Sequence, residues 1–178
     1  MMSDEMSEIF SRRMKLGGIA SAPVSRAIAA TPVECAALAA LFGLPGIAAL
    51  EGEFLVSHER GGVLLAEVKL SARVTQVCVV TLEPFDTKIS EVTTLRFVPS
   101  AKVREGEPLV LDAETLEGPD EIPYAGEAID LGAVLAEQLA LVLDPYPRKP
   151  GAKLPEGFGE EETSGPMAAL LAFKKPEV

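Results

Sequence analysis

Hydrophobic and polar residues alternate most cleanly between Ala66 and Thr75, and this run predicts a half-buried β-strand. A shorter alternation from Leu50 to Ser57 predicts a second strand, and the HERGG segment between the two supplies turn residues. We therefore expect an antiparallel hairpin. Its apolar face is expected to carry Leu50, Phe54, Val56, Ala66, Val68, Leu70, Ala72 and Val74.

The alternation breaks at Gln76, where four apolar residues follow in succession, and this predicts a bulge or bend. Pro84 lacks a backbone N–H group, so we expect the chain there to leave the sheet or to run along its edge. A further strand is predicted from Lys88 to Val98. Its first half alternates poorly, which favours an edge or bulged strand.

Two helices have clear start signals. Thr31 can cap a helix with Pro32 in its first turn and Glu34 completing a capping box, and Gly43 is a natural stop. The second helix begins after Asp130 and ends near Asp144. One face of this helix has apolar residues at helical spacing, namely Leu131, Val134, Leu135, Leu139 and Val142.

These elements predict an α+β fold in which two α-helices cover an antiparallel, curved β-sheet. The pattern does not decide whether the sheet closes into a barrel. Residues 1–146 are expected to form a single domain that includes a long acidic loop at about 99–128. Residues 147–178 are rich in Pro and Gly, and we expect a flexible tail with a short terminal helix.

The chain has a net charge of −11, and residues 99–130 alone contain nine acidic residues against two basic ones. Such a balance opposes non-specific binding to nucleic acid, because that binding depends on Lys and Arg replacing counterions. Direct RNA contact would need a local basic patch. The candidates are Arg12, Arg13 and Lys15 near the start of the chain, and Arg148, Lys149 and Lys153 after the second helix.

Residues suited to catalysis or metal binding are few. Two cysteines and one histidine do not make the four-ligand set of a structural zinc site, and there is no Gly-rich phosphate loop. We expect no catalytic residue, no cofactor and no metal, and hence no enzyme. The first residues are acidic, and the longest apolar stretch, residues 36–50, is interrupted by Gly and Pro. We therefore expect a cytoplasmic protein that does not enter a membrane.

Two segments of the chain have the character of family motifs. One is the run RVTQVCVVTLEPFDTKISEVTTLRF, from Arg73 to Phe97, and the other is the run IDLGAVLAEQLALVLDPYP, from Ile129 to Pro147. They resemble the YceD family, the large ribosomal RNA subunit accumulation proteins: the first is similar to a family motif of the form Cys-x-Arg-Cys-Leu-Glu-Pro-Phe, and the second to the helix that follows in that family. The matching positions are Cys78, Leu82, Glu83, Pro84, Phe85, Asp130 and Leu131.

The sequence departs from the family pattern at several cysteines. Val80 and Thr81 stand where many members have Arg and a second Cys, and no Cys follows the second helix. If the four-cysteine members bind a metal, the resemblance implies that this form does not. We expect Cys78 to be retained as a small buried hydrophobic residue.

The resemblance implies a non-enzymatic ribosome-biogenesis factor of bacterial type. Such a factor would promote the synthesis, processing or accumulation of large-subunit (23S) rRNA by binding that RNA or ribosomal and processing proteins. An alternative from a different class is a protein-interaction module for a metabolic partner, such as an enzyme of lipid synthesis.

Overall fold

A computed structural model describes residues 2–18, 22–100 and 118–154. Its centre is a five-stranded sheet in the order β2 (Val24–Ala29), β3 (Gly46–His58), β4 (Leu64–Val77), β5 (Pro84–Pro99) and β6 (Asp120–Tyr124). The first four strands are antiparallel neighbours, and β3 and β4 form the predicted hairpin around a short turn at Arg60–Gly62.

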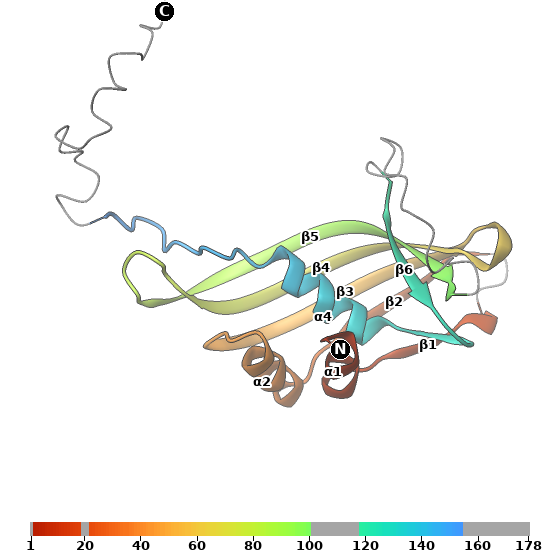
Figure 1. The fold of residues 1–178 in the computed structure, drawn as a ribbon, viewed down its shortest axis with the longest axis horizontal. Helices are drawn as coiled ribbons and strands as arrows, with labels where there is room; N and C mark the ends of the chain where they lie inside the picture. Colours follow the sequence, from red (N-terminus) through yellow and green to blue (C-terminus); the bar gives the residue numbers. More distant parts are fainter. Residues whose placement is uncertain (1, 19–21, 101–117, 155–178) are drawn as a thin grey trace, which may run out of the picture.

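Three helices lie on one face of this sheet (Figure 1). They are α1 (Met2–Ile9), α2 (Pro32–Leu41) and α4 (Leu131–Val142). A separate two-stranded sheet joins β1 (Arg13–Lys15), which is followed by a short turn at Leu16–Gly18, to β7 (Ala128–Asp130). Because β7 leads directly into α4, this small sheet holds the start of α4 beside the end of α1.

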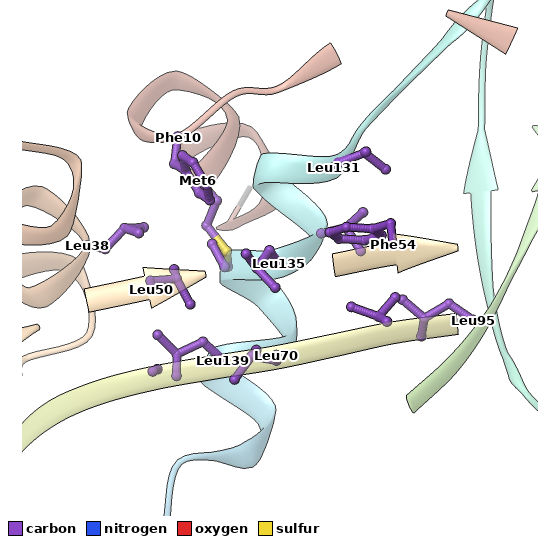
Figure 2. Packing of buried hydrophobic residues seen from close by; sticks show 14 of the residues in the cluster. Met6, Phe10, Leu38, Leu50, Phe54, Leu70, Leu95, Leu131, Leu135 and Leu139 are labelled. Atoms are coloured by element: carbon purple, nitrogen blue, oxygen red, sulfur yellow. The ribbon is translucent and has the colours of Figure 1, made fainter. Parts of the chain in front are cut away.

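The predicted apolar face is confirmed, and it forms the core. Phe54, Val56, Ala66 and Val68 are fully buried. Figure 2 shows Leu135 and Leu139 of α4 close to Leu50 and Leu70 of the sheet, with Met6 of α1 beside them. Leu131 lies toward Phe54, and Phe10 directly follows the end of α1. Gly52 allows this close packing, because a Cβ atom there would lie 2.7 Å from both methyl groups of Leu135. The helices thus cover the face that the alternation marked as apolar.

The sheet differs from the antiparallel prediction at one edge. β6 pairs with β5 in parallel, with Asp120 opposite Leu95 and Tyr124 opposite Pro99, so the sheet is mixed. This strand has no clear pattern in the sequence, because DEIPY contains two acidic residues and a proline and does not alternate. β2 and β6 end the hydrogen-bonded order, so the sheet is open and not barrel-like.

The prediction of two helices was also wrong, because α1 forms a third. Met6, Ile9 and Phe10 have the i, i+3, i+4 spacing of a helix face, and this signal could have revealed it. Part of the range predicted as an acidic loop, 99–128, is strand, since Pro99 ends β5, Asp120–Tyr124 form β6 and Ala128 begins β7. Residues 101–117 of that loop, and the tail beyond Leu154, lie outside the described residues.

No bulge occurs at Gln76. The register between β4 and β5 continues without a shift to the pair Val77–Pro84, and the irregularity lies in β3, between Ile47 and Ala49. Gln76 faces the core and is only 4% exposed, with its side-chain amide donating to the carbonyl oxygen of Asp144 at 3.2 Å. Since the glutamine is satisfied by this hydrogen bond, it can occupy an apolar position without breaking the strand.

The predicted helix boundaries are confirmed. Thr31 caps α2, its side chain accepting from the backbone of Glu34, whose own side chain accepts from the Thr31 N–H. Gly43 follows the end of this helix with a φ of 66°, a conformation that favours glycine. Asp130 caps α4.

Candidate functional site

Asp130, the first residue of the second motif, holds together the ends of two helices. Its Oδ1 atom accepts hydrogen bonds from the backbone N–H groups of Arg12 at 2.7 Å, Gly132 at 3.0 Å and Ala133 at 3.4 Å. Its Oδ2 atom accepts from the hydroxyl of Ser7 at 2.9 Å. The carboxylate therefore caps α4 and fixes the chain that leaves α1, and its role in the described structure is architectural.

The hydrogen bonds at Asp130 also determine its ionisation. Burial raises the pKa of this carboxyl, but donors from Ser11, the Arg12 backbone and Ser7 outweigh burial and hold the pKa below its usual range. Leu131, the next motif residue, is 2% exposed and packs in the core. The Asp130 carboxylate is thus held by hydrogen bonds, and Leu131 carries no reactive group.

Arg12, one of the candidate RNA contacts, is engaged inside the protein. Its guanidinium donates to both carboxylate oxygens of Glu34 at 2.9 Å, and it lies over the ring of Phe10 at 4.8 Å from the centroid. This two-point pairing joins α2 to the segment after α1. Arg12 is therefore less available to an external anion than Arg13 and Lys15, which are exposed on β1.

The Arg12–Glu34 pair predicts a specific loss of stability in acid. The hydrogen bond from Arg12 lowers the pKa of Glu34 from 4.5 to about 2, so folding favours the ionised form. The stabilisation is complete above pH 4.5 and disappears as the pH falls toward 2. Urea midpoints measured against pH should show the advantage of the wild type over Glu34→Gln shrinking in this window. Glu8→Gln, at an exposed position of α1, is the control; an advantage independent of pH would contradict the assignment.

The first motif forms a tight turn between β4 and β5. The N–H of Cys78 donates to the carbonyl of Glu83 at 2.9 Å, and the N–H of Leu82 donates to the carbonyl of Cys78 at 2.8 Å. The N–H of Val79 donates to the carbonyl of Pro147 at 2.9 Å. We call residues 78–83 together with 146–149 the motif turn. It joins two segments that the sequence could not place next to each other.

Cys78 lies at the centre of this turn and is completely buried. A hydrogen bond with the Thr81 side chain lowers the pKa of its thiol, burial raises it, and the backbone N–H groups of Lys149, Thr81 and Val80 lower it further, to about 7. The thiol is thus a hydrogen-bond acceptor as well as the small buried residue that was expected.

Groups within the motif turn are bound to one another. The backbone N–H of Thr81 donates to the Sγ atom of Cys78 at 3.4 Å, and the ammonium group of Lys149 donates to the Glu83 carboxylate at 2.9 Å. This ion pair lowers the pKa of Glu83 and raises that of Lys149. Across residues 2–18, 22–100 and 118–154, no three His, Cys, Asp or Glu side chains are grouped as metal ligands.

Leu82 is unusual in both conformation and exposure. Its φ is 57°, in the left-handed region that non-glycine residues seldom adopt, and its side chain is 77% exposed. Val79 and Tyr146 of the motif turn are also exposed. The remaining motif residues continue the strand: Pro84 begins β5, and Phe85 is half-buried opposite Gln76. The turn therefore holds a strained leucine at the surface on a fixed backbone.

The strain at Leu82 gives a prediction with opposite signs for two substitutions. Leu82→Asn should raise the free energy of unfolding by about 0.5–1 kcal/mol, because asparagine tolerates a left-handed backbone that is costly for leucine. Leu82→Val should lower it, since a β-branched side chain is worse there. Urea unfolding measures both. A leucine more stable than asparagine would contradict the assigned backbone.

The two predicted basic clusters lie apart. Arg13 and Lys15 are close to the start of α4, whereas Arg148, Lys149 and Lys153 follow its end (Figure 1). The helix between them has 12 residues, a length of about 18 Å. The sequence interpretation missed Arg26, which is exposed on β2 and shares a groove with Arg13 and Lys15. Its only sequence signal was its place in the VSRAIA segment.

No described helix is long and apolar enough to cross a membrane. Searches of curated proteins and of solved structures each found no match. A family model with the description "Large ribosomal RNA subunit accumulation protein YceD" matches residues 66–174, which is more than half of the 178 residues. The match includes β4 from Ala66 onward, the motif turn, β5 and α4, together with all the positions on which the sequence resemblance rested. The chain therefore belongs to the YceD family.

Proposed function

We propose that this protein is a non-enzymatic factor that promotes the accumulation of large-subunit (23S) rRNA. It would act in the cytoplasm by binding that RNA, or ribosomal and processing proteins on the particle where the RNA matures. The observation that carries the proposal is the family match over residues 66–174, because the family is described by this effect on ribosomal RNA.

The character of the motif residues supports binding rather than catalysis. Glu83, an exposed acid of the motif, is paired with Lys149, and the thiol of Cys78 is inaccessible. Asp130 is occupied by five hydrogen bonds, three of them from backbone N–H groups. General acid–base or nucleophilic catalysis needs reactive groups that can reach a substrate. The motif residues hold the fold together and expose Leu82 at the surface, as expected of a factor that binds a partner.

Two measurements from one lysate of the native cells test the proposal. RNA crosslinked to the protein is sequenced, and proteins captured with it are identified by mass spectrometry. Reads concentrated on large-subunit rRNA would support direct RNA binding. Ribosomal or processing proteins without such reads would support an adaptor. Capture of metabolic enzymes, such as those of lipid synthesis, with neither rRNA nor ribosomal proteins would overturn the proposal.

A further inference from the structure

Residues of β1 and β2 line a groove at the edge of the sheet opposite β6. Figure 1 shows the two strands. The groove has a volume of about 920 Å³, and a second hollow of about 730 Å³ adjoins it at Arg13, Lys15 and Gly17. We call the two together the basic groove. Met14, Ile28 and Leu131 form its apolar floor.

The walls of the basic groove carry positive charge. Arg13 and Lys15 project from β1 on one face, because the buried Met14 between them points inward. Arg26 lies across from them on β2 and is exposed. Among the described residues, these three cations form no ion pair, whereas Arg12 nearby is paired with Glu34. One carboxylate, that of Glu127, lines the adjoining hollow.

Three cations that form no ion pair with any described residue line one groove, although the whole chain has a net charge of −11. Like charges close together repel, and an anion between them removes this cost. Arg13, Lys15 and Arg26 lie outside residues 66–174, so the positive charge of the groove is an observation independent of the family match. Its charge is complementary to a polyanion, while most of the chain would repel one.

We propose that the basic groove binds consecutive phosphates of a single-stranded RNA segment; this inference rests on the proposed function and names the surface that would perform it. Arg13 and Lys15 are two positions apart on a strand, about 7 Å, a distance comparable to that between successive phosphates of an extended strand. A phosphodiester strand carries a charge at every nucleotide, so it can contact cations on both walls. The apolar floor lies beneath the sugar and base faces.

Fluorescence anisotropy tests the inference with the full-length protein and a labelled single-stranded RNA of about 12 nucleotides. The test variant is Arg13→Gln, Lys15→Gln, Arg26→Gln. Each phosphate contact on a single strand contributes about 0.7 to the slope of log K against log salt. Removing three contacts should lower the slope by about 2, and at about 0.15 M salt it should weaken binding about 50-fold.

The matched control is Lys69→Gln, Arg73→Gln, Lys88→Gln, which removes three exposed cations from the uncovered face of β4 and β5. Circular dichroism and urea midpoints verify that both variants fold. The inference requires that the groove variant binds the RNA more weakly than the wild type does, and that the control variant binds it with wild-type affinity. An equal loss of RNA affinity in both variants would show that binding depends on total charge and not on the groove, and would overturn the inference. Unchanged binding by the groove variant, or wild-type binding to an acidic peptide in place of RNA, would also overturn it.

Failure of this inference can be separated from failure of the proposed function. If cells need the protein for rRNA accumulation and the groove variant replaces it fully, the function stands and the groove assignment falls. If the groove variant loses RNA binding in vitro but cells without the protein accumulate normal rRNA, the proposed function falls and the RNA site stands.

Discussion

Replacing Asp130 with alanine is expected to lower the free energy of unfolding by about 2–4 kcal/mol. Loss of a helix N-cap costs about 0.5–2 kcal/mol. The substitution also leaves the part-buried N–H of Arg12 without its acceptor, and an unsatisfied buried donor costs about 1–3 kcal/mol. The two effects act at one point, where α4 meets the chain leaving α1. Urea unfolding monitored by circular dichroism measures the change.

Asp130→Asn is the informative comparison. Asparagine retains one side-chain oxygen that can cap α4, but it has neither the second acceptor nor the charge. We expect its cost to fall well below that of alanine. Equal effects of the two substitutions would show that the charge, not the cap, gives Asp130 its importance. A cost below about 1 kcal/mol for alanine would contradict the described hydrogen bonds.

Gly132→Ala is the second substitution with a large expected effect, and its sign is unusual. In an ordinary helix interior this change stabilises by about 1 kcal/mol. Here an added Cβ would lie 2.5 Å from the carbonyl oxygen of Phe10 and 2.9 Å from the N–H nitrogen of Arg12. These are backbone atoms that cannot turn aside, so we expect a loss of about 2–3 kcal/mol, toward the upper end of the range for overpacking.

Gly17→Ala is the matched control for Gly132→Ala, because a Cβ atom at Gly17 has no neighbour within 4 Å. We expect its unfolding midpoint to stay close to that of the wild type. If Gly132→Ala stabilised the protein, the start of α4 could not be packed against residues 10–12 as described. Both Asp130 and Gly132 thus contribute to one contact, which also positions the neighbouring Arg13 and Lys15.

Local signals were sufficient to predict the hairpin and two of the helices. The alternation from Ala66 to Thr75 identified the buried face correctly, and the capping residues Thr31 and Asp130 marked the helix starts. These predictions succeeded because burial on one face of a strand, or a cap on a helix end, depends on neighbours in sequence.

The features that the sequence did not reveal depend on distant partners. β6 is a parallel edge strand that half-exposes its few apolar residues, so its pattern is weak. Gln76 appeared to break a strand, because its partner, the carbonyl of Asp144, is 68 residues away. The same limit applies to the site. Glu83 and Lys149 were identified separately, and only the fold shows that they meet.

The group of basic residues predicted from the sequence to contact RNA differs from the group that the structure brings together. Arg12 was grouped with Arg13 and Lys15 because the three are close in sequence. The structure pairs Arg12, which also lines the groove, with Glu34, and it adds Arg26 from another strand. A basic cluster in sequence becomes a surface only when its members project to one side and have no internal partners.

The most direct test of the central claim is the ratio of large-subunit to small-subunit rRNA in cells depleted of the protein. Cells that regain the wild-type chain serve as the control. The proposed function predicts that depletion lowers large-subunit rRNA relative to small-subunit rRNA, and that the wild-type chain restores the ratio. An unchanged ratio, with the protein fully depleted, would contradict it.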